Sequence, residues 1–448
     1  MKNTSFLLLL ISLGFFANAQ INLTLQQALE RAIQQNEDIA IVQQKALLES
    51  QKIFKANAGL TPTVSAFANG TYTQYNTLLG LNSALLGGGN MGGGAPEAQE
   101  ISEDLAGSMT HSAGGRMDYT LYDGGRGKKT LRQLENLANL ASLQQQLTTD
   151  NVLLGVSQRY LSIASMERMA GLLRQNIELS QERLERAELD NKYAKGNGLS
   201  VLRAKTDLNT DNVSLKNLER DIVNTKQDLL RQLDMSANYN FSTAEVINLQ
   251  ALPDFESLKA SALQKNPQIL LAKQGIVIDE QQLAISETAN LPRVSVYGSL
   301  DYFRQDYEVN QIEYLQNIGP SMGFSVQYSL YDGNKRRREQ DIQRMQIRIR
   351  EKERVLTSEN VLLDLNKSWN NYQNIQTQLA FKQQNLPFYE ENLNRLQTNY
   401  KTGKASETDI RNAQLGLLSA QISITRKEIE LQMEHFKLLK IAGMITTI

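Results

Sequence analysis

The stretch Leu121-Tyr122-Asp123-Gly124 recurs unchanged as Leu330-Tyr331-Asp332-Gly333. In both places the word Asn-Val-Leu-Leu follows 30 positions later, at residues 151–154 and 360–363. Identical words in the same order and at equal spacing indicate an internal repeat. The chain of 448 residues therefore contains one structural unit twice, and this doubling constrains the architecture before any single side chain does.

The N-terminal residues have the pattern of a secretory signal peptide. Lys2 precedes an apolar run from Phe6 to Phe16, and the small-residue sequence Ala17-Asn18-Ala19 follows. A positive start, a short apolar run and a small-residue cleavage site are the three parts of such a peptide. We expect residues 1–19 to be removed on export. The alternative is a buried N-terminal helix.

The composition excludes several classes of site. The chain has no cysteine, which rules out disulfides, thiolate metal sites and catalytic thiols. Its two histidines, His111 and His435, lie far apart in the sequence, and its net charge of -1 gives no support for nucleic-acid binding. No phosphate-binding loop and no nucleophile–base pair emerge from the residue pattern. We therefore expect no cofactor, no metal and no enzymatic activity.

Apolar residues recur at helical spacing through much of the chain. Leu208, Leu215, Ile222 and Leu229 are seven residues apart, which is the spacing of a coiled-coil seam. The pattern predicts two long helices, at residues 126–190 and 335–399. Shorter helices are predicted at residues 24–57, 201–233, 255–288 and 406–438. Each repeat is thus a long helical hairpin with one interrupted limb.

We predict β-structure at the interruptions. Residues 63–72 and 294–300 follow Pro62 and Pro292, and apolar side chains alternate with serine and glutamine in residues 324–330. Period-two alternation is typical of a strand with one apolar and one polar face. Runs of about ten residues suit a membrane strand, although an ordinary soluble hairpin has the same pattern.

These elements define the domain organisation. The first repeat comprises residues 20–235 with a β-hairpin at 62–122, and the second comprises residues 255–448 with a β-hairpin at 292–331. Residues 236–254 form a linker between the repeats. The first hairpin is longer because it contains the glycine-rich tract Gly87–Gly94, which we expect to be a loop at the strand tips.

The predicted strands imply self-assembly. Four strands are too few for a membrane barrel, since single-chain examples use at least about eight. Open sheet edges in lipid leave backbone groups unpaired at a cost of several kcal/mol each. A symmetric ring of three copies would supply twelve strands and close the sheet. The expected fold is a mixed α and β membrane protein, a trimer whose 12-stranded β-barrel continues into an α-helical barrel. Such a shape is a conduit.

Two sequence segments resemble those of a known family. These are Leu121-Tyr122-Asp123-Gly124-Gly125 and the segment from Tyr400 to Ile410, which reads Tyr-Lys-Thr-Gly-Lys-Ala-Ser-Glu-Thr-Asp-Ile. Within the doubled unit they resemble the TolC-type outer membrane efflux proteins, and the likeness covers essentially the whole mature chain. The resemblance implies a homotrimer in the outer membrane lipid, with its helical tube in the periplasm.

The same resemblance implies a function. Members of the family passively conduct drugs, ions or secreted proteins outward, as the duct of a tripartite efflux or type I secretion system. They act with an inner-membrane transporter and a periplasmic adaptor that docks on the tips of the helical hairpins. The alternative that the residues leave open is a soluble periplasmic coiled-coil scaffold without a pore.

The resemblance also implies site residues. The docking tips correspond to Tyr193 and Gly196 in the first repeat and to Tyr400 and Gly403 in the second. In the family an acidic pair after the second tip constricts the entrance. Asp409 matches the first acid, whereas the second position is Asn412; the first repeat has Ser200 and Arg203 there. Alternatively, Asp409 only stabilises the start of its helix.

The strand-to-helix turns, predicted at Asp123, Gly124, Asp332 and Gly333, are followed by basic residues. Arg126, Lys128 and Lys129 follow the first turn, and Lys335 to Arg338 follow the second. Cations at the start of a helix oppose its dipole. We expect them to lie at the rim of the membrane, near lipid phosphates. Salt bridges or simple solvation are the alternatives.

Overall fold

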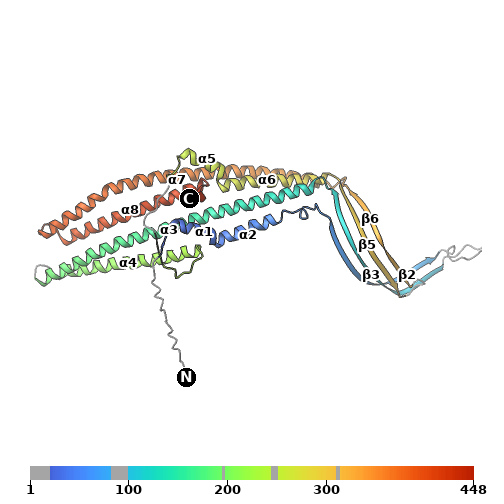
Figure 1. The fold of residues 1–448 in the computed structure, drawn as a ribbon, viewed down its shortest axis with the longest axis horizontal. Coiled ribbons are helices and arrows are strands. Elements are labelled where there is room, and N and C mark those ends of the chain that lie inside the picture. The colour runs from blue at the N-terminus through green and yellow to red at the C-terminus, as the bar shows by residue number, and fades with distance from the viewer. Residues whose placement is uncertain (1–20, 82–98, 194–196, 244–250, 309–312, 448) are drawn as a thin grey trace, which may run out of the picture. The chain divides into compact units, whose positions relative to one another are not determined.

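The computed structural model describes residues 21–81, 99–193, 197–243, 251–308 and 313–447. The predicted signal peptide, the tract Gly87–Gly94 and Gly196 lie outside these described residues. The elements follow the order β1-α1-α2-β2-β3-α3-α4-β4-α5-α6-β5-β6-α7-α8, with short 3₁₀ helices η2 (Thr288–Asn290) and η3 (Ile445–Thr447) (Figure 1).

Three of the four helices in each repeat have a counterpart of equal length, and the exception is α2 with 15 residues against 21 in α6. Those of the first repeat are α1 (Leu25–Gln35), α2 (Glu37–Gln51), α3 (Arg126–Lys192) and α4 (Gly198–Gln232). Those of the second are α5 (Phe255–Lys265), α6 (Pro267–Glu287), α7 (Lys335–Lys401) and α8 (Glu407–Ile441). Both α3 and α7 have 67 residues, and both α4 and α8 have 35. The long helices begin at the predicted residues and end two residues later than predicted.

Two of the predicted short helices are broken by an asparagine. We predicted single helices at 24–57 and 255–288, but the first divides at Asn36 and the second at Asn266. Each side-chain amide donates to a carbonyl at the end of another helix, Asn36 to Gln232 over 2.8 Å and Asn266 to Ile441 over 2.9 Å. Each side-chain oxygen accepts from a backbone N–H of the next helix. The break therefore satisfies the last turns of α4 and α8.

Apolar seams hold each helical hairpin together. Leu184 and Ala187 of α3 pack on Ala204 of α4, and Leu393 of α7 packs on Ile410 and Ala413 of α8. Figure 1 shows α3 beside α4 and α7 beside α8. The largest buried cluster surrounds the middle of α3 and takes in α1 and the end of α4. The coiled-coil spacing read from the sequence thus marks the buried faces.

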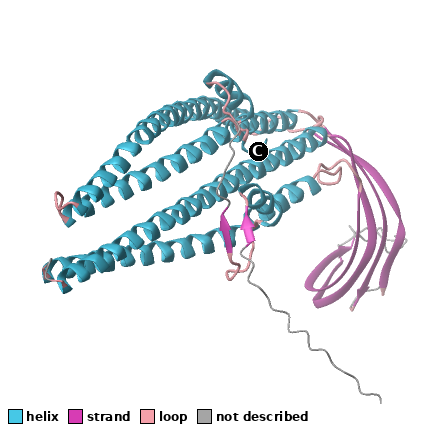
Figure 2. Ribbon diagram, turned by 60° about the vertical axis from the view of Figure 1, so that its left-hand side comes forward, coloured by secondary structure: helices cyan, strands magenta, loops and turns pink. Residues whose placement is uncertain are grey.

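One strand of a short parallel pair lies within the segment predicted as a linker, and the other lies at the start of the first repeat. β1 (Ile21–Leu23) pairs with β4 (Phe241–Thr243), and Figure 2 shows them as two short magenta arrows. The buried Tyr160 hydroxyl donates to the Leu23 carbonyl oxygen over 2.7 Å. Three-residue strands carry too weak a pattern to be seen in the sequence.

The larger sheet has four antiparallel strands in the order β2-β3-β5-β6. They are β2 (Thr63–Leu81), β3 (Gln99–Tyr122), β5 (Arg293–Tyr307) and β6 (Tyr314–Gln327). All four exceed the predicted ten residues, at 19, 24, 15 and 14 residues. The last strand, however, ends at Gln327 rather than Leu330. Its partner there is Arg293, and the preceding Pro292 has no N–H to extend the pairing.

The chain divides into two compact units that cut across the repeats. One comprises the residues up to Leu47 together with 139–275 and 350 onwards; the other comprises 48–138 and 276–349. The first contains the helical hairpins, and the second contains the four-stranded sheet with the helix ends that adjoin it. Each repeat contributes to both units.

Candidate functional site

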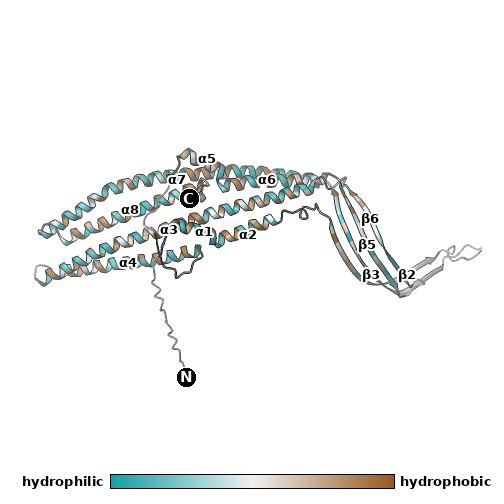
Figure 3. Ribbon diagram, viewed as in Figure 1, coloured by the Kyte–Doolittle hydropathy of each residue, from teal (hydrophilic) through white to brown (hydrophobic). Residues whose placement is uncertain are grey.

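From the row of Val294 to the row of Tyr302, the four-stranded sheet has one apolar and one polar face, and beyond that the first face carries the Arg304–Asp306 ion pair. Because side chains alternate, residues aligned in the register share a face. The apolar face includes Val64, Met117, Val294, Val296, Leu300, Ile318, Met322, Phe324 and Val326. Met322 is 86% exposed and Phe324 75% exposed. Figure 3 shows the alternation as brown and teal segments along the strands. An apolar face this exposed needs a nonaqueous partner.

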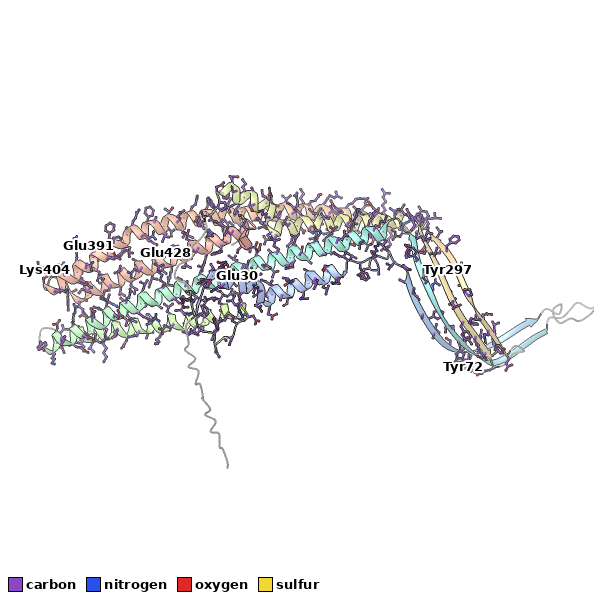
Figure 4. All side chains as sticks on the ribbon, viewed as in Figure 1. Glu30, Tyr72, Tyr297, Glu391, Lys404 and Glu428 are labelled. Carbon is purple, nitrogen blue, oxygen red and sulfur yellow. The ribbon has the colours of Figure 1, made fainter. Side chains whose placement is uncertain are left out.

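The opposite face carries small and charged side chains. Arg116 pairs with Asp118 over 2.8 Å, and its guanidinium lies 4.5 Å from the ring centre of Tyr297, which Figure 4 labels. Ser299 and Ser321 face each other across β5 and β6, with their hydroxyl oxygens 2.8 Å apart. These groups suit contact with water. The sheet is therefore built to separate an apolar medium from an aqueous one.

Both edges of this sheet are unpaired in the single chain. The strand order places β2 at one edge and β6 at the other, and no further described strand pairs with either edge. Unpaired edges offer rows of backbone N–H and C=O groups to another chain. Their combination with an exposed apolar face is the main structural evidence for assembly.

Helix α7 also presents an unpartnered seam. Ile342, Ile349, Leu356 and Leu363 are seven residues apart, and their exposed fractions are 63%, 50%, 57% and 50%. A heptad of apolar residues normally packs into a neighbouring helix. This seam is a second surface that a neighbouring copy could cover.

The tip of the second hairpin is a closely hydrogen-bonded turn. Gly403 has φ +74°, and its N–H donates to the Tyr400 carbonyl over 3.0 Å. Ser406 and Asp409 form a capping box at the start of α8: the Asp409 N–H donates to the Ser406 hydroxyl, and the Ser406 N–H donates to the Asp409 carboxylate over 2.9 Å. Lys404 in Figure 4 marks this tip.

The capping box affects the charge of Asp409, the acid predicted to lie at the entrance. Hydrogen bonds from the Ser406 side chain and backbone hold the pKa of Asp409 below its ordinary value, so the exposed carboxylate is ionised. Asn412 is also exposed, one helical turn further along α8. Asp409 thus stabilises its helix and still presents a fixed negative charge. The two readings of this residue are compatible.

The first tip is described only in part. Tyr193 is 66% exposed at the end of α3, whereas Gly196 lies outside the described residues. Asn197 caps α4 by accepting a hydrogen bond from the Ser200 N–H over 3.0 Å. No acid occupies the place that Asp409 has in the second hairpin. The two tips are therefore chemically different.

A buried polar cluster near the tips joins the two hairpins. Arg411 of α8 donates to Asp211 of α4 through two nitrogen atoms, over 2.8 and 2.7 Å. Ser180 and Asn176 of α3 donate to the same carboxylate over 2.7 and 2.9 Å. We call Arg411, Asp211, Ser180 and Asn176 the tie. The tie could not be predicted from the sequence, because charged residues on helices are normally exposed to solvent.

The electrostatics of the tie favour its charged form. Burial by itself would raise the pKa of Asp211, but hydrogen bonds from Arg411 and Ser180 lower it below its ordinary value. Arg183 and Asp207 extend the cluster, with Arg183 donating to Asp207 over 3.2 Å. The Arg411 side chain is only 11% exposed and the Asp211 side chain only 8%. Removing one partner would leave the other charge buried and uncompensated.

The predicted strand-to-helix turns have a common construction. Gly124 and Gly333 adopt φ values of +70° and +68°. The Asp123 carboxylate accepts from the Gly127 N–H over 2.8 Å, and the Asp332 carboxylate accepts from the Arg336 N–H over 3.1 Å. A side chain at Gly124 would meet Leu291 within 3 Å. Each aspartate therefore caps a long helix where the chain leaves the sheet.

The described residues show neither a metal site nor a membrane-spanning helix. No group of three or more histidine, aspartate and glutamate side chains in the described residues could hold a metal ion. None of the helices in the described part of the chain combines the length and the apolar character that a membrane crossing requires.

Comparisons with known proteins bear on the family. Residues 258–444, most of the second repeat, match the family model described as outer membrane efflux protein. No curated protein sequence matches the chain significantly.

Solved structures share the fold. The outer membrane protein VceC from Vibrio cholerae is 14% identical with a TM-score of 0.72, over 94% of this chain and 96% of that one. The CmeC outer membrane channel of Campylobacter jejuni is 14% identical with a TM-score of 0.75, over 94% and 86%. A Pseudomonas aeruginosa membrane protein reaches 0.76 at 14% identity, over 95% and 91%. The resemblance to the TolC-type outer membrane efflux proteins is thereby confirmed, through the family match of the second repeat and the fold of nearly the whole chain.

Proposed function

We propose that this protein is the outer-membrane duct of a tripartite efflux or type I secretion system. The observation that carries the proposal is the sheet: one face is apolar and exposed, the other is polar, and both edges are unpaired. A membrane sheet must satisfy all of its backbone groups, and closure into a barrel does so. The polar face then lines the pore.

We propose three copies, the number that the resemblance to the family implies. Each chain supplies four strands, and twelve strands exceed the minimum of about eight that a membrane barrel needs. Closure requires β6 of one copy to pair with β2 of the next, and these two strands run antiparallel within the sheet as a whole. The exposed heptad seam of α7 supports packing between copies along the helices. The helices would then form a tube in the periplasm.

The duct is passive and non-catalytic. Its family and structural neighbours are channels. Energy for transport comes from an inner-membrane transporter, and a periplasmic adaptor docks on the hairpin tips around Tyr193, Gly196, Tyr400 and Gly403. Asp409 and Asn412 line the periplasmic aperture in threefold-related copies. The cargo passes from this aperture to the exterior.

The tie provides a means of controlling the aperture. It fastens α8, the helix that carries Asp409, to α3 and α4 of the first hairpin. A hairpin fastened in this way keeps its tip close to its neighbour, and release of the Arg411–Asp211 pair frees the second hairpin to move. Opening the entrance therefore requires this buried pair to be broken or replaced by contacts with a partner.

The test is single-channel conductance of the purified protein in a planar bilayer. A duct gives long-lived, unitary steps of conductance. A soluble periplasmic scaffold, the alternative function, gives none and is recovered without detergent. The exposed apolar face of the sheet argues against the scaffold, because a soluble protein would gain nothing from Met322 and Phe324 on its surface.

A further inference from the structure

The basic residues that follow the two strand-to-helix turns fall into two groups: those that bond to other residues of the chain and those that do not. Lys129 donates to the Ala284 carbonyl over 2.8 Å. Arg336 contacts the Asp332 carboxylate over 2.7 Å and donates to the carbonyls of Ala289 and Ser329. These two serve the fold. Five others are exposed and have no side-chain hydrogen bond or ion pair with any described residue: Arg126, Lys128, Lys335, Arg337 and Arg338.

We call these five residues the basic rim. They lie in the first turns of α3 and α7, and neither first turn contains an acidic residue. The N-terminal end of a helix carries partial positive charge, so each cation is placed where the backbone repels it. Asp123 and Asp332 each cap a backbone N–H but do not neutralise the exposed side chains. An anion from outside the chain would relieve this repulsion.

The residues next to the basic rim indicate which kind of anion it binds. Toward the sheet, the chain next to the rim exposes Tyr122, Tyr328 and Tyr331, with exposed fractions of 47%, 53% and 80%. Beyond the tyrosines comes the apolar face, beginning with Val294 and Val326, which pair in the register. At a membrane–water interface, proteins typically show this order: an apolar surface in the lipid, then tyrosine, then lysine and arginine on the water side.

We propose that the basic rim binds the phosphates of anionic phospholipids in the leaflet that faces the helices. The inference rests on the proposed function, which places the sheet in the bilayer. The long stems of lysine and arginine can lie along the acyl region while their charges reach the headgroups. Anionic lipid surfaces attract such residues additively. In a threefold assembly the rims of the copies form a ring that fixes the height of the sheet in the membrane.

The experiment compares two variants of equal charge. The rim variant carries Arg126→Gln, Lys128→Gln, Lys335→Gln, Arg337→Gln and Arg338→Gln. The control variant replaces five exposed lysines elsewhere on the helices by glutamine: Lys45, Lys192, Lys205, Lys352 and Lys367. Each detergent-purified assembly is titrated with short-chain phosphatidylglycerol and, separately, with short-chain phosphatidylcholine. The readout is the rise in melting temperature and the lipid concentration that half-saturates it.

We expect the wild type and the control variant to prefer phosphatidylglycerol, and the rim variant to need at least tenfold more of it. The difference should shrink in high salt, because salt screens exposed charges. Equal affinity of the rim variant and the wild type overturns the inference, as does a wild type without preference for the anionic lipid.

Two further measurements keep the test decisive. A smaller variant with only Lys128, Arg337 and Arg338 replaced should lose less affinity, and it decides the question if the full rim variant does not assemble. Conductance is recorded for all forms. A conducting wild type without lipid preference refutes the basic rim alone, whereas a wild type that never conducts refutes the proposed duct.

Discussion

Arg411 and Asp211 lie 200 positions apart in the sequence and are joined by two hydrogen bonds, over 2.8 and 2.7 Å. The first residue belongs to the second repeat and the second to the first repeat. Both side chains are almost wholly buried, and Ser180 and Asn176 complete the coordination of the carboxylate. A buried pair of this kind gains little over apolar packing but is costly to break. It therefore suits a contact that must hold until a partner releases it.

Replacing Arg411 by alanine should open the aperture. Loss of one partner from a buried pair costs roughly 3 kcal/mol, which removes most of the preference for the fastened hairpin. We expect the open probability of single channels to rise at least several-fold. The control is Arg174→Ala, which removes an exposed ion pair with Glu219 inside one hairpin and should leave gating unchanged. Arg411→Ala channels that gate like the wild type would show that the tie is only structural.

The charge of Asp409 can be separated from its capping role. Asp409→Asn retains an acceptor for the Ser406 N–H but removes the charge, whereas Asp409→Ala removes both and costs about 1 kcal/mol of helix stability. We expect both variants to lose cation preference in reversal-potential measurements. Only the alanine variant should also melt at a lower temperature. Wild-type ion selectivity in both would refute the aperture role.

Introduced cysteines can report the pairing of sheet edges, since the natural chain has none. Ser65 of β2 is placed on the same face as Ser321 of β6 by the register, and Ser325 follows on that face. Ser65→Cys combined with Ser321→Cys or Ser325→Cys should give disulfide-linked dimers and trimers on oxidation. Each single-cysteine variant is the control and should stay monomeric under denaturing conditions. If no pair along the two edges cross-links, β2 and β6 do not meet between copies.

Asp150 predicts a pH dependence of stability. Burial raises its pKa to about 6, with Lys440 opposing the rise, and one of its carboxylate oxygens has no hydrogen-bond partner among the described residues. The folded protein therefore binds this proton more tightly than the unfolded chain, whose aspartate has a pKa of about 3.9. Stability falls as the pH rises from about 4 to about 6 and stays lower above it.

Asp150→Asn should thus stabilise the protein at pH 8, by about 1–2 kcal/mol, and have little effect near pH 4. Melting temperatures of the detergent-purified variant and wild type at the two pH values give the comparison. Asp228→Asn, on the exposed face of α4, serves as the control and should change neither value. A variant that is destabilised at pH 8 would mean that Asp150 is needed as a partner for Lys440.

The sequence predicted the long elements well because their evidence is local. Helices α3 and α7 begin directly after the Asp-Gly turns, and the seven-residue spacing from Leu208 to Leu229 lies within α4. The breaks at Asn36 and Asn266 could not be predicted, although both positions belong to the repeat. Each asparagine caps a helix end that is distant along the chain, 196 residues away for Asn36 and 175 for Asn266, so the local sequence does not distinguish it from an ordinary helix residue.

The candidate site was predicted less completely for the same reason. Gly403, Ser406 and Asp409 form a turn whose partners are only a few residues apart, so the stabilising role of Asp409 at the start of its helix could be predicted from its position. In the sequence, Asp211 and Arg411 have the pattern of exposed charged residues, because only the packing of one repeat on the other buries them. The strands extend further than predicted because their outer parts lack a regular alternation of apolar and polar residues; β2, for example, ends in Leu-Leu-Gly-Leu.

The most direct test of the central claim is the number of chains in the particle extracted from outer membranes, measured as a detergent-corrected protein mass. The unpaired edges of the sheet and the exposed α7 seam predict an assembly of several copies, and the proposed duct has three per particle. A mass of three mature chains would show that the strands have the partners needed to close a barrel. A monomer, or a protein recovered from the periplasm without detergent, would contradict the shared barrel and leave the four strands without a membrane role.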